Sequence, residues 1–161
     1  MNIGAGKEYP SNALSNFAPH PFTFTYDGVT VECASMEGLL QSFKFKNPEM
    51  QKHICTLVGR AAKFAGKEKN WKDKQILWWN EKEIKRSSQE YQDLLDAAFD
   101  ALSTNIGFQK ALIASGKGTL EHTIGRTSPR DTVLTRAEFC GRLTKIRERL
   151  NENSLCQTKK L

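Results

Sequence analysis

The stretch PFTFTYDGVTVECASMEGLLQSFKF, residues 21–45, contains both kinds of secondary structure expected of this chain. Aromatic residues alternate with threonine over residues 22–26, and hydrophobic residues alternate with polar ones over residues 29–33. Such alternation is typical of strands with one buried face. The Asp27-Gly28 dipeptide between them favours a tight turn. The first half therefore predicts a β-hairpin, which needs a helical layer over one face to be stable.

A helix is expected directly after this hairpin. Ser35 has the short polar side chain that caps helix N-termini. Hydrophobic residues then recur at helical spacing, namely Met36, Leu39, Leu40 and Phe43. Asn47-Pro48 begins a second helix, whose apolar stripe continues to a stop at Gly66. The stretch KEKNWKDKQILWWN, residues 67–80, contains three tryptophans and predicts a short helix against the core.

The C-terminal half is expected to be helical as well. Ser87 and Glu90 form a capping box for a long helix over residues 87–102. A short helix over residues 108–113 is closed by a glycine, and a capping box at residues 135–138 opens the last helix. The composition of residues 1–20 favours a long loop.

Together these elements predict an α+β fold, mainly helical, with a small antiparallel sheet packed on the helices. No internal repeat or linker divides the chain. We therefore expect one domain over residues 1–150, followed by a polar, flexible tail over residues 151–161.

Composition limits the chemistry. The chain has 24 Lys and Arg against 18 Asp and Glu, a formal net charge of +6 that suits anionic partners but also an ordinary basic protein. The cysteines never form a CxxC pair, so neither a metal nor another cofactor is expected. The N-terminus lacks the apolar core of a signal peptide, and no apolar run could span a bilayer. A cytoplasmic protein without a membrane partner is predicted.

Three polar residues lie along one edge of the first helix. Glu37, Gln41 and Lys44 follow one another at helical spacing, beside the apolar stripe. Glu37 in the first turn would feel the positive end of the helix dipole, which favours its ionised form. An ionised carboxylate can activate water, attack C1 or stabilise the oxocarbenium-like charge of a departing glycoside. Lys44 could hold a phosphate, bond the ring or attack as an amine, although such residues are also common on solvated helix edges.

The sequence resembles the YbiA-like, or NADAR, family. The resemblance is carried by SNF at residues 15–17, the DG hairpin and SMEGLLQSFKF at residues 35–45. The segments GRAAKFAGK, Asn70-Trp71 and AEFCGRLTKIRERL extend it to about residues 7–150. The chain departs from the family pattern at Gly38, where relatives often have His, and at DTVLTRAE from Asp131, where relatives have WGxG.

The resemblance implies a metal-independent N-glycosidase, a hydrolase that cleaves the N-glycosidic bond at C1 of a phosphorylated or ADP-linked ribose. It implies catalytic roles for Glu37 and Lys44. It also implies substrate contacts from Ser15, Asn16, Phe17, Gln41, Trp71 and Asp131. From residue type alone, Asn16 could equally cap a turn, and Trp71 could equally be packing. His20, His53 and His122 are possible proton donors outside the Glu37 motif.

Two substrate classes follow from the resemblance: ADP-ribosylated guanine in nucleic acid, and ribosylamino-pyrimidine phosphates of riboflavin synthesis. Both are anionic, so the basic composition agrees with either. An alternative is a different class of protein, a catalytically silent module. It would bind ADP-ribose or modified nucleic acid in the cleft expected between the N-terminal loop and the Glu37 helix. A structural nucleic-acid-binding protein driven by charge alone is a third interpretation, and its affinity should fall steeply with salt.

Overall fold

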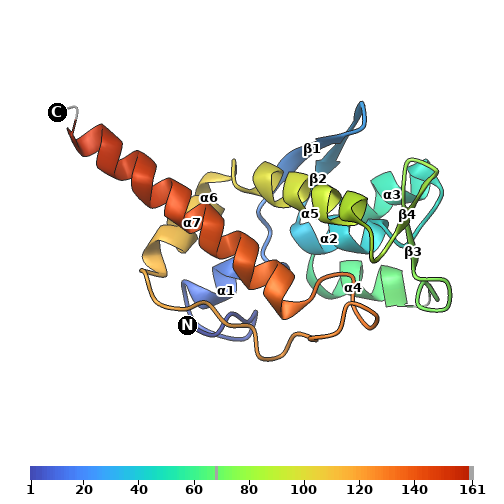
Figure 1. Ribbon diagram of the computed structural model, residues 1–161, viewed down its shortest axis with the longest axis horizontal. Coiled ribbons are helices and arrows are strands. Elements are labelled where there is room, and N and C mark those ends of the chain that lie inside the picture. Colours follow the sequence, from blue (N-terminus) through green and yellow to red (C-terminus); the bar gives the residue numbers. More distant parts are fainter. Residues whose placement is uncertain (68, 160–161) are drawn as a thin grey trace.

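The computed structural model describes residues 1–67 and 69–159. These form a mainly helical α+β fold with two small antiparallel sheets (Figure 1). In chain order the elements are α1 (Ser11–Leu14), β1 (Phe22–Tyr26), β2 (Val29–Cys33), α2 (Met36–Ser42), α3 (Pro48–Cys55), α4 (Gly59–Lys67), β3 (Ile76–Trp79), β4 (Lys82–Lys85), α5 (Gln89–Leu102), α6 (Ile106–Ala114) and α7 (Arg136–Lys159). Within the described residues, no helix is long and apolar enough to cross a membrane.

The predicted hairpin is confirmed. Strands β1 and β2 pair antiparallel, with Phe24 opposite Val31, and both side chains are buried. On the other face, the hydroxyls of Thr25 and Thr30 lie 2.8 Å apart and are exposed. Asp27 and Gly28 both have positive φ (52° and 77°), as the tight turns that match strand twist require. The buried face of the hairpin is covered by α5, which packs on β1.

Helix α2 lies at the centre of the molecule, as Figure 1 shows. It packs against β2, α3, α4 and α5. Its predicted cap is confirmed, because Ser35 Oγ accepts a hydrogen bond of 3.2 Å from the backbone N–H of Gly38. Leu39, Leu40 and Phe43 are almost completely buried. The helix is therefore fixed on most of its circumference by apolar packing.

The prediction of one helix from Asn47 to Gly66 is wrong, because the segment divides into α3 and α4. Gly59 has a φ of +54°, a left-handed conformation that favours glycine and interrupts a helix. The carbonyls freed by the break are used by the chain before α2. Ala34 N–H donates to the Cys55 carbonyl at 2.8 Å, and Ser35 Oγ donates to the Leu57 carbonyl at 2.9 Å.

The short helix predicted within residues 67–80 is also wrong. Strand β3 pairs antiparallel with β4, and the turn residues Asn80 and Glu81 have φ of 48° and 70°. Leu77 and Trp79 are buried while their neighbours are half-buried, which is the alternation of a strand. Trp79 Nε1 donates to the Tyr26 carbonyl at 3.0 Å, so the second hairpin is tied to the first.

The C-terminal helices differ from prediction only at their ends. The cap of α5 is Ser88, not Ser87, since Ser88 Oγ accepts from Tyr91 N–H at 3.1 Å. Helix α6 is confirmed, as is the capping box of α7, in which Thr135 and Glu138 exchange hydrogen bonds. Helix α7 continues to Lys159 through the residues predicted as a tail, of which residues 160–161 lie outside the described ranges. No Gly or Pro lies between residues 142 and 159 to end it.

A buried ion pair joins the two halves of the chain. Arg86, which follows β4 and is 2% exposed, makes two hydrogen bonds to the Glu138 carboxylate, at 3.1 and 2.7 Å. Gln92 of α5 adds a bond of 2.7 Å to the same carboxylate. Burial by itself would raise the pKa of Glu138, but the bonds from Arg86, Gln92 and the Thr135 N–H outweigh burial and hold that pKa below its ordinary value.

Replacing Glu138 by Gln should therefore destabilise the fold, because Arg86 would remain buried without a counter-charge. Loss of one partner of a buried pair costs about 3 to 5 kcal/mol in unfolding free energy. A carboxyl whose pKa is depressed in the folded state stabilises at pH values above its unfolded pKa, and that stabilisation disappears as the pH falls through the folded pKa. The difference between wild type and E138Q in urea unfolding should be large at neutral pH and should shrink in acid. Glu83→Gln, on the exposed side of β4, is the matched control, and an equal loss there would contradict the assignment.

Candidate functional site

A cavity of about 280 Å³ lies between the N-terminal loop, α2, α4 and the loops that precede α7. The sequence predicts that this loop and the Glu37 helix form a cleft, and both line it. Its walls comprise Ala5, Ser15, Asn16, Phe17, Glu37, Leu40, Gln41, Lys63, His122, Ile124, Gly125, Arg126, Thr132, Val133, Leu134 and Phe139. Five of the predicted site residues are therefore brought together here: Ser15, Asn16, Phe17, Glu37 and Gln41.

Glu37 is positioned by both its backbone and its side chain. Its N–H donates to the Asn16 carbonyl at 3.0 Å, which ties the first turn of α2 to the N-terminal loop. One carboxylate oxygen accepts a bond of 2.9 Å from Gln41 Nε2, one helical turn further on. The other oxygen makes no hydrogen bond with the described residues. The carboxyl group thus has one oxygen held and one oxygen available on the cavity side.

The surroundings of Glu37 correct the prediction that its position favours ionisation. Burial raises the pKa of Glu37 above its ordinary value, and this effect exceeds the opposing effects of the Gln41 hydrogen bond and of Lys44, Lys63 and His122. The helix dipole would decide the ionisation of Glu37 only if the first turn were solvated. The structure instead places this turn behind the N-terminal loop, where the charged form loses hydration.

Two buried amide oxygens at the cavity lack a hydrogen-bond donor within the described residues: Asn16 Oδ1 and Gln41 Oε1. An unpartnered buried acceptor is unfavourable, so such atoms usually mark a place for water or ligand. Gly66 of α4 lies against Gln41, and a Cβ at this position would come within 1.8 Å of Gln41 Oε1. Glycine is therefore required there for Gln41 to keep its place.

Lys44, the second predicted catalytic residue, lies just beyond the end of α2 and does not line the cavity. Its Nζ is 3.4 Å from the Gly66 carbonyl. Burial lowers the pKa of Lys44, the charge of Glu37 opposes that shift, and Lys72 and Lys63 add to it. Lys44 therefore acts on Glu37 through its charge, and a direct role at the substrate stays a prediction.

The other two predicted contacts lie outside the cavity wall. Trp71 is 7% exposed and belongs to the hydrophobic core, in agreement with the packing alternative. Asp131 is exposed, one residue before the segment that forms a wall. These positions do not support the predicted contacts with substrate, which stay predictions for both residues.

Three ionisable residues of the cavity wall were not predicted as site residues. His122 was noted as a possible proton donor only, and the structure places it on the wall. Its Nδ1 lies 2.9 Å from the Ile3 carbonyl, which can only accept, so Nδ1 carries a proton and Nε2 remains to bind or release another. Lys63 and Arg126 are exposed cations on the same wall. Their positions depend on contacts between distant segments, which no local pattern encodes.

The segment that replaces the WGxG of relatives also forms part of the wall. Thr132, Val133 and Leu134 line the cavity, and two of their carbonyls are held by the core. Arg86 Nε donates to the Thr132 carbonyl at 2.9 Å, and the Tyr91 hydroxyl donates to the Val133 carbonyl at 2.5 Å. The segment that departs from the family pattern therefore still forms a wall on this side of the cavity.

Gly38, the other departure, is explained by packing. A Cβ there would lie 2.8 Å from both the Ile54 and Leu57 carbonyl oxygens, which are backbone atoms at the end of α3 and in the turn after it. Any side chain would push α2 away from this turn. The histidine that relatives often have at this position has no room in this arrangement.

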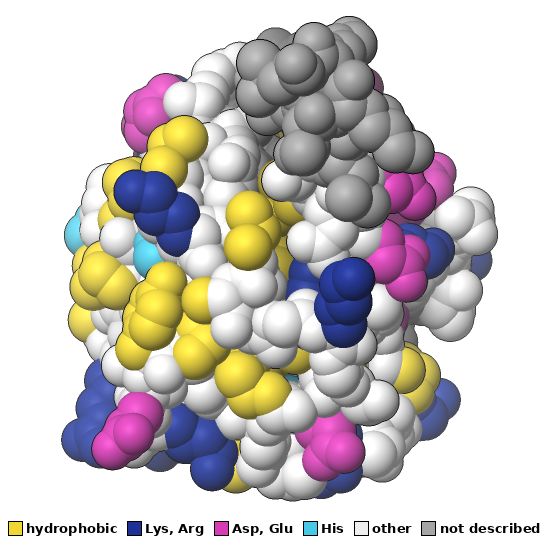
Figure 2. All heavy atoms as spheres, turned by 90° about the vertical axis from the view of Figure 1, so that its left-hand side faces the viewer, with side chains coloured by type: hydrophobic (Ala, Val, Ile, Leu, Met, Phe, Trp, Pro, Cys, Tyr) yellow, Lys and Arg dark blue, Asp and Glu magenta, His cyan; other side chains and the backbone are white. Residues whose placement is uncertain are grey.

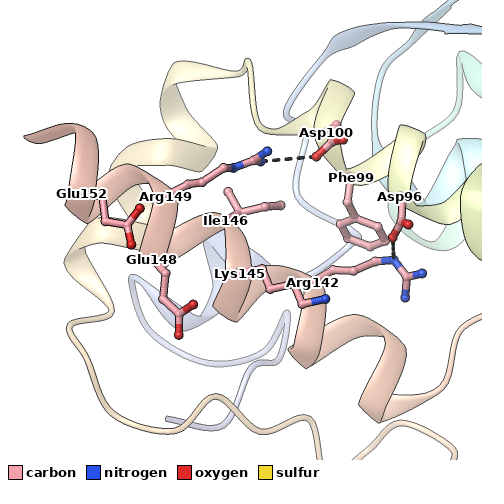
Figure 3. A pocket seen from close by; sticks show the side chains of 9 residues that line it. All are labelled: Asp96, Phe99, Asp100, Arg142, Lys145, Ile146, Glu148, Arg149 and Glu152. Atoms are coloured by element: carbon pink, nitrogen blue, oxygen red, sulfur yellow. Dashed lines mark hydrogen bonds and ion pairs between the residues drawn. The ribbon is translucent and has the colours of Figure 1, made fainter.

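A second groove, of about 430 Å³, lies between α5 and α7 (Figure 3). Its two arginines pair with acidic side chains across the groove, Arg142 with Asp96 at 2.9 Å and Arg149 with Asp100 at 3.3 Å. These cations are thus already neutralised, unlike Lys63 and Arg126. Across the described ranges, no group of three His, Cys, Asp or Glu side chains could hold a metal ion.

Comparison with known proteins agrees with this architecture. The family model described as bacteriophage protein GP30.3 matches residues 8–148. The chain belongs to the bacteriophage GP30.3 family. A protein of 17.1 kDa from the Gp30-rIII intergenic region of Enterobacteria phage T4 is 38% identical to it over 153 residues, covering 93% of this chain and 98% of the relative.

The GP30.3-family chain also has the fold of a solved structure. It matches the NMR structure of the E. coli protein YbiA with a TM-score of 0.61 and 17% sequence identity, over 96% of this chain and 86% of YbiA. The YbiA-like fold predicted from the SNF and SMEGLLQSFKF segments is therefore confirmed.

The packing of Gly38 gives one test. Gly38→Ala should lower the unfolding free energy by about 1 to 3 kcal/mol, because the added methyl group forces backbone apart in a dense core. Gly141→Ala in α7 is the matched control, since a Cβ there meets nothing within 4 Å. Alanine in place of glycine within a helix should stabilise by roughly 0.5 to 1 kcal/mol. Urea unfolding of both variants measures the contrast, and a neutral G38A would show that α2 does not lie this close to the turn.

The raised pKa of Glu37 gives a second test. A carboxyl with a raised folded pKa holds its proton more tightly when folded, so its contribution to stability declines as the pH rises past the unfolded pKa. Glu37→Gln removes this ionisation and keeps the acceptor for Gln41. The variant should be more stable than wild type at neutral and alkaline pH, and the two should converge in acid. Thermal unfolding as a function of pH measures the difference, and a constant offset would show that Glu37 is solvated.

Proposed function

We propose that the Glu37 cavity hydrolyses the N-glycosidic bond of a ribose that carries a phosphate or an ADP group. The observation that carries this proposal is the arrangement of one desolvated carboxyl group, Glu37, beside two unpartnered buried acceptors, Asn16 Oδ1 and Gln41 Oε1. The resemblance to the YbiA-like family and the shared fold support it.

The acceptors suit a sugar. Ribose hydroxyl groups are hydrogen-bond donors, and a donor from the ligand would satisfy the Asn16 oxygen that the protein leaves unpaired, whereas Gln41 Oε1 faces Gly66 of α4. Phe17 and Leu40 supply apolar surface beside these polar groups, as is usual for small-molecule sites. The site thus offers polar contacts for the sugar and a nonpolar surface for its ring face or base.

The carboxyl group suits water activation at C1. Glu37 would accept a proton from a water molecule as the water oxygen bonds to C1 and the C1–N bond breaks, and the bonding electrons would leave with the base. The departing nitrogen then needs a proton, which His122 Nε2 or solvent would supply. A carboxyl with a raised pKa is a better base than an ordinary one and is closer to the operating pH.

The cations of the rim suit the anionic part of the substrate. Lys63 and Arg126 are exposed, line the cavity, and form no ion pair with the described residues. Phosphate oxygens would be attracted to both, and Arg126 could bind two of them at once. A neutral nucleoside should accordingly be a poorer substrate than its phosphorylated form.

The test is base release, measured side by side on an ADP-ribosylated guanine oligonucleotide and on a ribosylamino-pyrimidine phosphate. Glu37→Gln should lower kcat by at least about 100-fold, in the range of a lost general base, while the fold is kept. Glu90→Gln is the matched control, because Glu90 also lies in a first helical turn, that of α5, and is not at the cavity. His122→Asn should lower kcat and alter the pH profile if the histidine protonates the base.

The outcomes of this assay distinguish hydrolysis from binding alone and test the role of Glu37. Release by wild type and not by E37Q, from one substrate only, would establish the activity and its branch. Turnover retained in E37Q would overturn the assignment of Glu37. Tight binding of ADP-ribose by wild type without product from either substrate would replace hydrolysis by the binding-module alternative, which uses the same acceptors and cations.

A further inference from the structure

The positive charge of the chain is concentrated in one segment, residues 44–74. This segment has nine Lys and Arg against three Asp and Glu, a net charge of +6. The formal net charge of the whole chain is also +6, so the remaining residues balance to zero. Figure 2 views the end of the molecule near α6, where acidic and basic side chains are intermixed. The net positive charge is therefore located at the end formed by α3, α4 and the residues between α4 and β3.

The cations of this segment are largely unpaired. Within the part of the chain that the structure describes, the ion pair of Lys52 with Glu49, at 3.6 Å, is the one that involves these basic residues. Lys63, Lys67 and Lys69 are exposed. A concentration of unpaired, exposed cations produces a local positive potential that attracts polyanions.

Aromatic rings lie directly beside these lysines. Lys67 Nζ is 5.3 Å from the ring centre of Phe64, and Lys69 Nζ is 5.1 Å from that of Phe45. Lys46 Nζ is 5.4 Å from that of Trp78. Phe64 is 63% exposed, far more than a core phenylalanine. The surface therefore alternates cations with flat apolar faces.

The surface is also hollowed. A hollow of about 620 Å³ lies beside Phe45, Lys46 and Lys69, and Met50, which is 44% exposed, forms part of its wall. Most of the surface that lines this hollow is apolar. Its size suits one or two planar rings, and lysines at its rim are placed to meet negative groups attached to them.

This surface is continuous with the Glu37 cavity through α4. Lys63 lines the cavity, and Lys67 lies one helical turn further along the same face of α4. Lys69 follows the end of α4 and reaches Phe45, at the end of α2. A chain of phosphates could therefore run from the cavity to the hollow over one set of cations.

We propose that the basic aromatic strip, defined as Phe45, Lys46, Phe64, Lys67 and Lys69, binds a single strand of nucleic acid that enters the Glu37 cavity with one nucleotide. This inference rests on the proposed function and assigns the substrate to the nucleic-acid class. Phosphates pair with the lysines and bases stack on the exposed rings, which is the general mode of single-strand binding. A lipid surface or a polyglutamate chain would use the lysines but has no planar rings for Phe45 and Phe64.

The test is binding of a fluorescent, unmodified single-stranded oligonucleotide to the full chain, measured by anisotropy at several salt concentrations. Lys67→Glu with Lys69→Glu should weaken binding at least about tenfold and reduce the slope of log affinity on log salt by about 0.7 for each phosphate that the protein no longer neutralises. Phe64→Ala should weaken binding without changing that slope, because stacking releases no counterions. Lys110→Glu with Lys117→Glu, exposed lysines outside the strip, is the matched control and should leave affinity within about twofold.

Several outcomes would overturn the proposal. Equal losses of affinity in the control pair would show attraction by total charge alone, and an unchanged affinity in F64A would remove the stacking role. Binding of anionic phospholipid vesicles or of polyglutamate as tightly as the oligonucleotide would show a general polyanion surface. Because the oligonucleotide is unmodified and its binding needs no turnover, the binding assay gives its result whether or not the proposed hydrolysis occurs, so the two failures can be told apart. Base release from a small phosphorylated substrate without oligonucleotide binding would sink this inference and retain the proposed function.

Discussion

The close contact between α2 and the turn after α3 is the constraint on which the rest of the structure depends. The Ser35 hydroxyl both caps α2 and donates to the Leu57 carbonyl. Gly38 allows α2 to lie against the Ile54 and Leu57 carbonyls, because it has no Cβ. These contacts fix the rotation of α2, and that rotation directs Glu37 and Gln41 toward the N-terminal loop while Leu39 and Phe43 enter the core.

A second, independent constraint completes the cavity from the other side. Arg86 binds both the Glu138 carboxylate and the Thr132 carbonyl, so the same guanidinium anchors α7 and the wall that precedes it. Arg136 donates to the Gly125 carbonyl at 2.5 Å and also to that of Thr123, which holds the loop containing His122. This side of the cavity thus depends on two arginines that do not themselves line it, and a rigid scaffold supports the loops that form the wall.

Local patterns were sufficient where local energetics decide the structure. Alternation and Asp27-Gly28 predicted the first hairpin, and Ser35 predicted the start of α2, because turn and cap preferences act over a few residues. The second hairpin was missed because Asn80-Glu81 is a weak turn signal. The tryptophans indicated packing against the core, which suits a helix and a strand equally. The single helix from Asn47 to Gly66 was wrong because the apolar stripe does not reveal the break near Gly59, whose φ of +54° interrupts a helix.

The site was predictable in part because some of its residues lie in short local motifs. Residues 15–17 and the Glu37 stripe are short motifs, and the structure brings them to one cavity. Lys63, His122 and Arg126 could not be found this way, since they meet Glu37 only through tertiary packing. The pKa of Glu37 shows the limit most clearly: the position of Glu37 in the first turn of α2 is a local property, but its burial is not, and burial is the largest influence on its pKa.

The desolvated carboxyl and the exposed cations have a common consequence for an anionic substrate. A phosphate that enters the cavity adds negative charge near Glu37, and by itself this would raise the pKa of Glu37 further and reduce the fraction able to accept a proton. Lys63 and Arg126 on the same wall counter that effect, because each neutralises the charge where the substrate introduces it. Lys63 already lowers the pKa of Glu37 in the free protein. In the proposed mechanism, the rim cations would therefore hold the substrate and also keep Glu37 able to accept a proton once the substrate is bound.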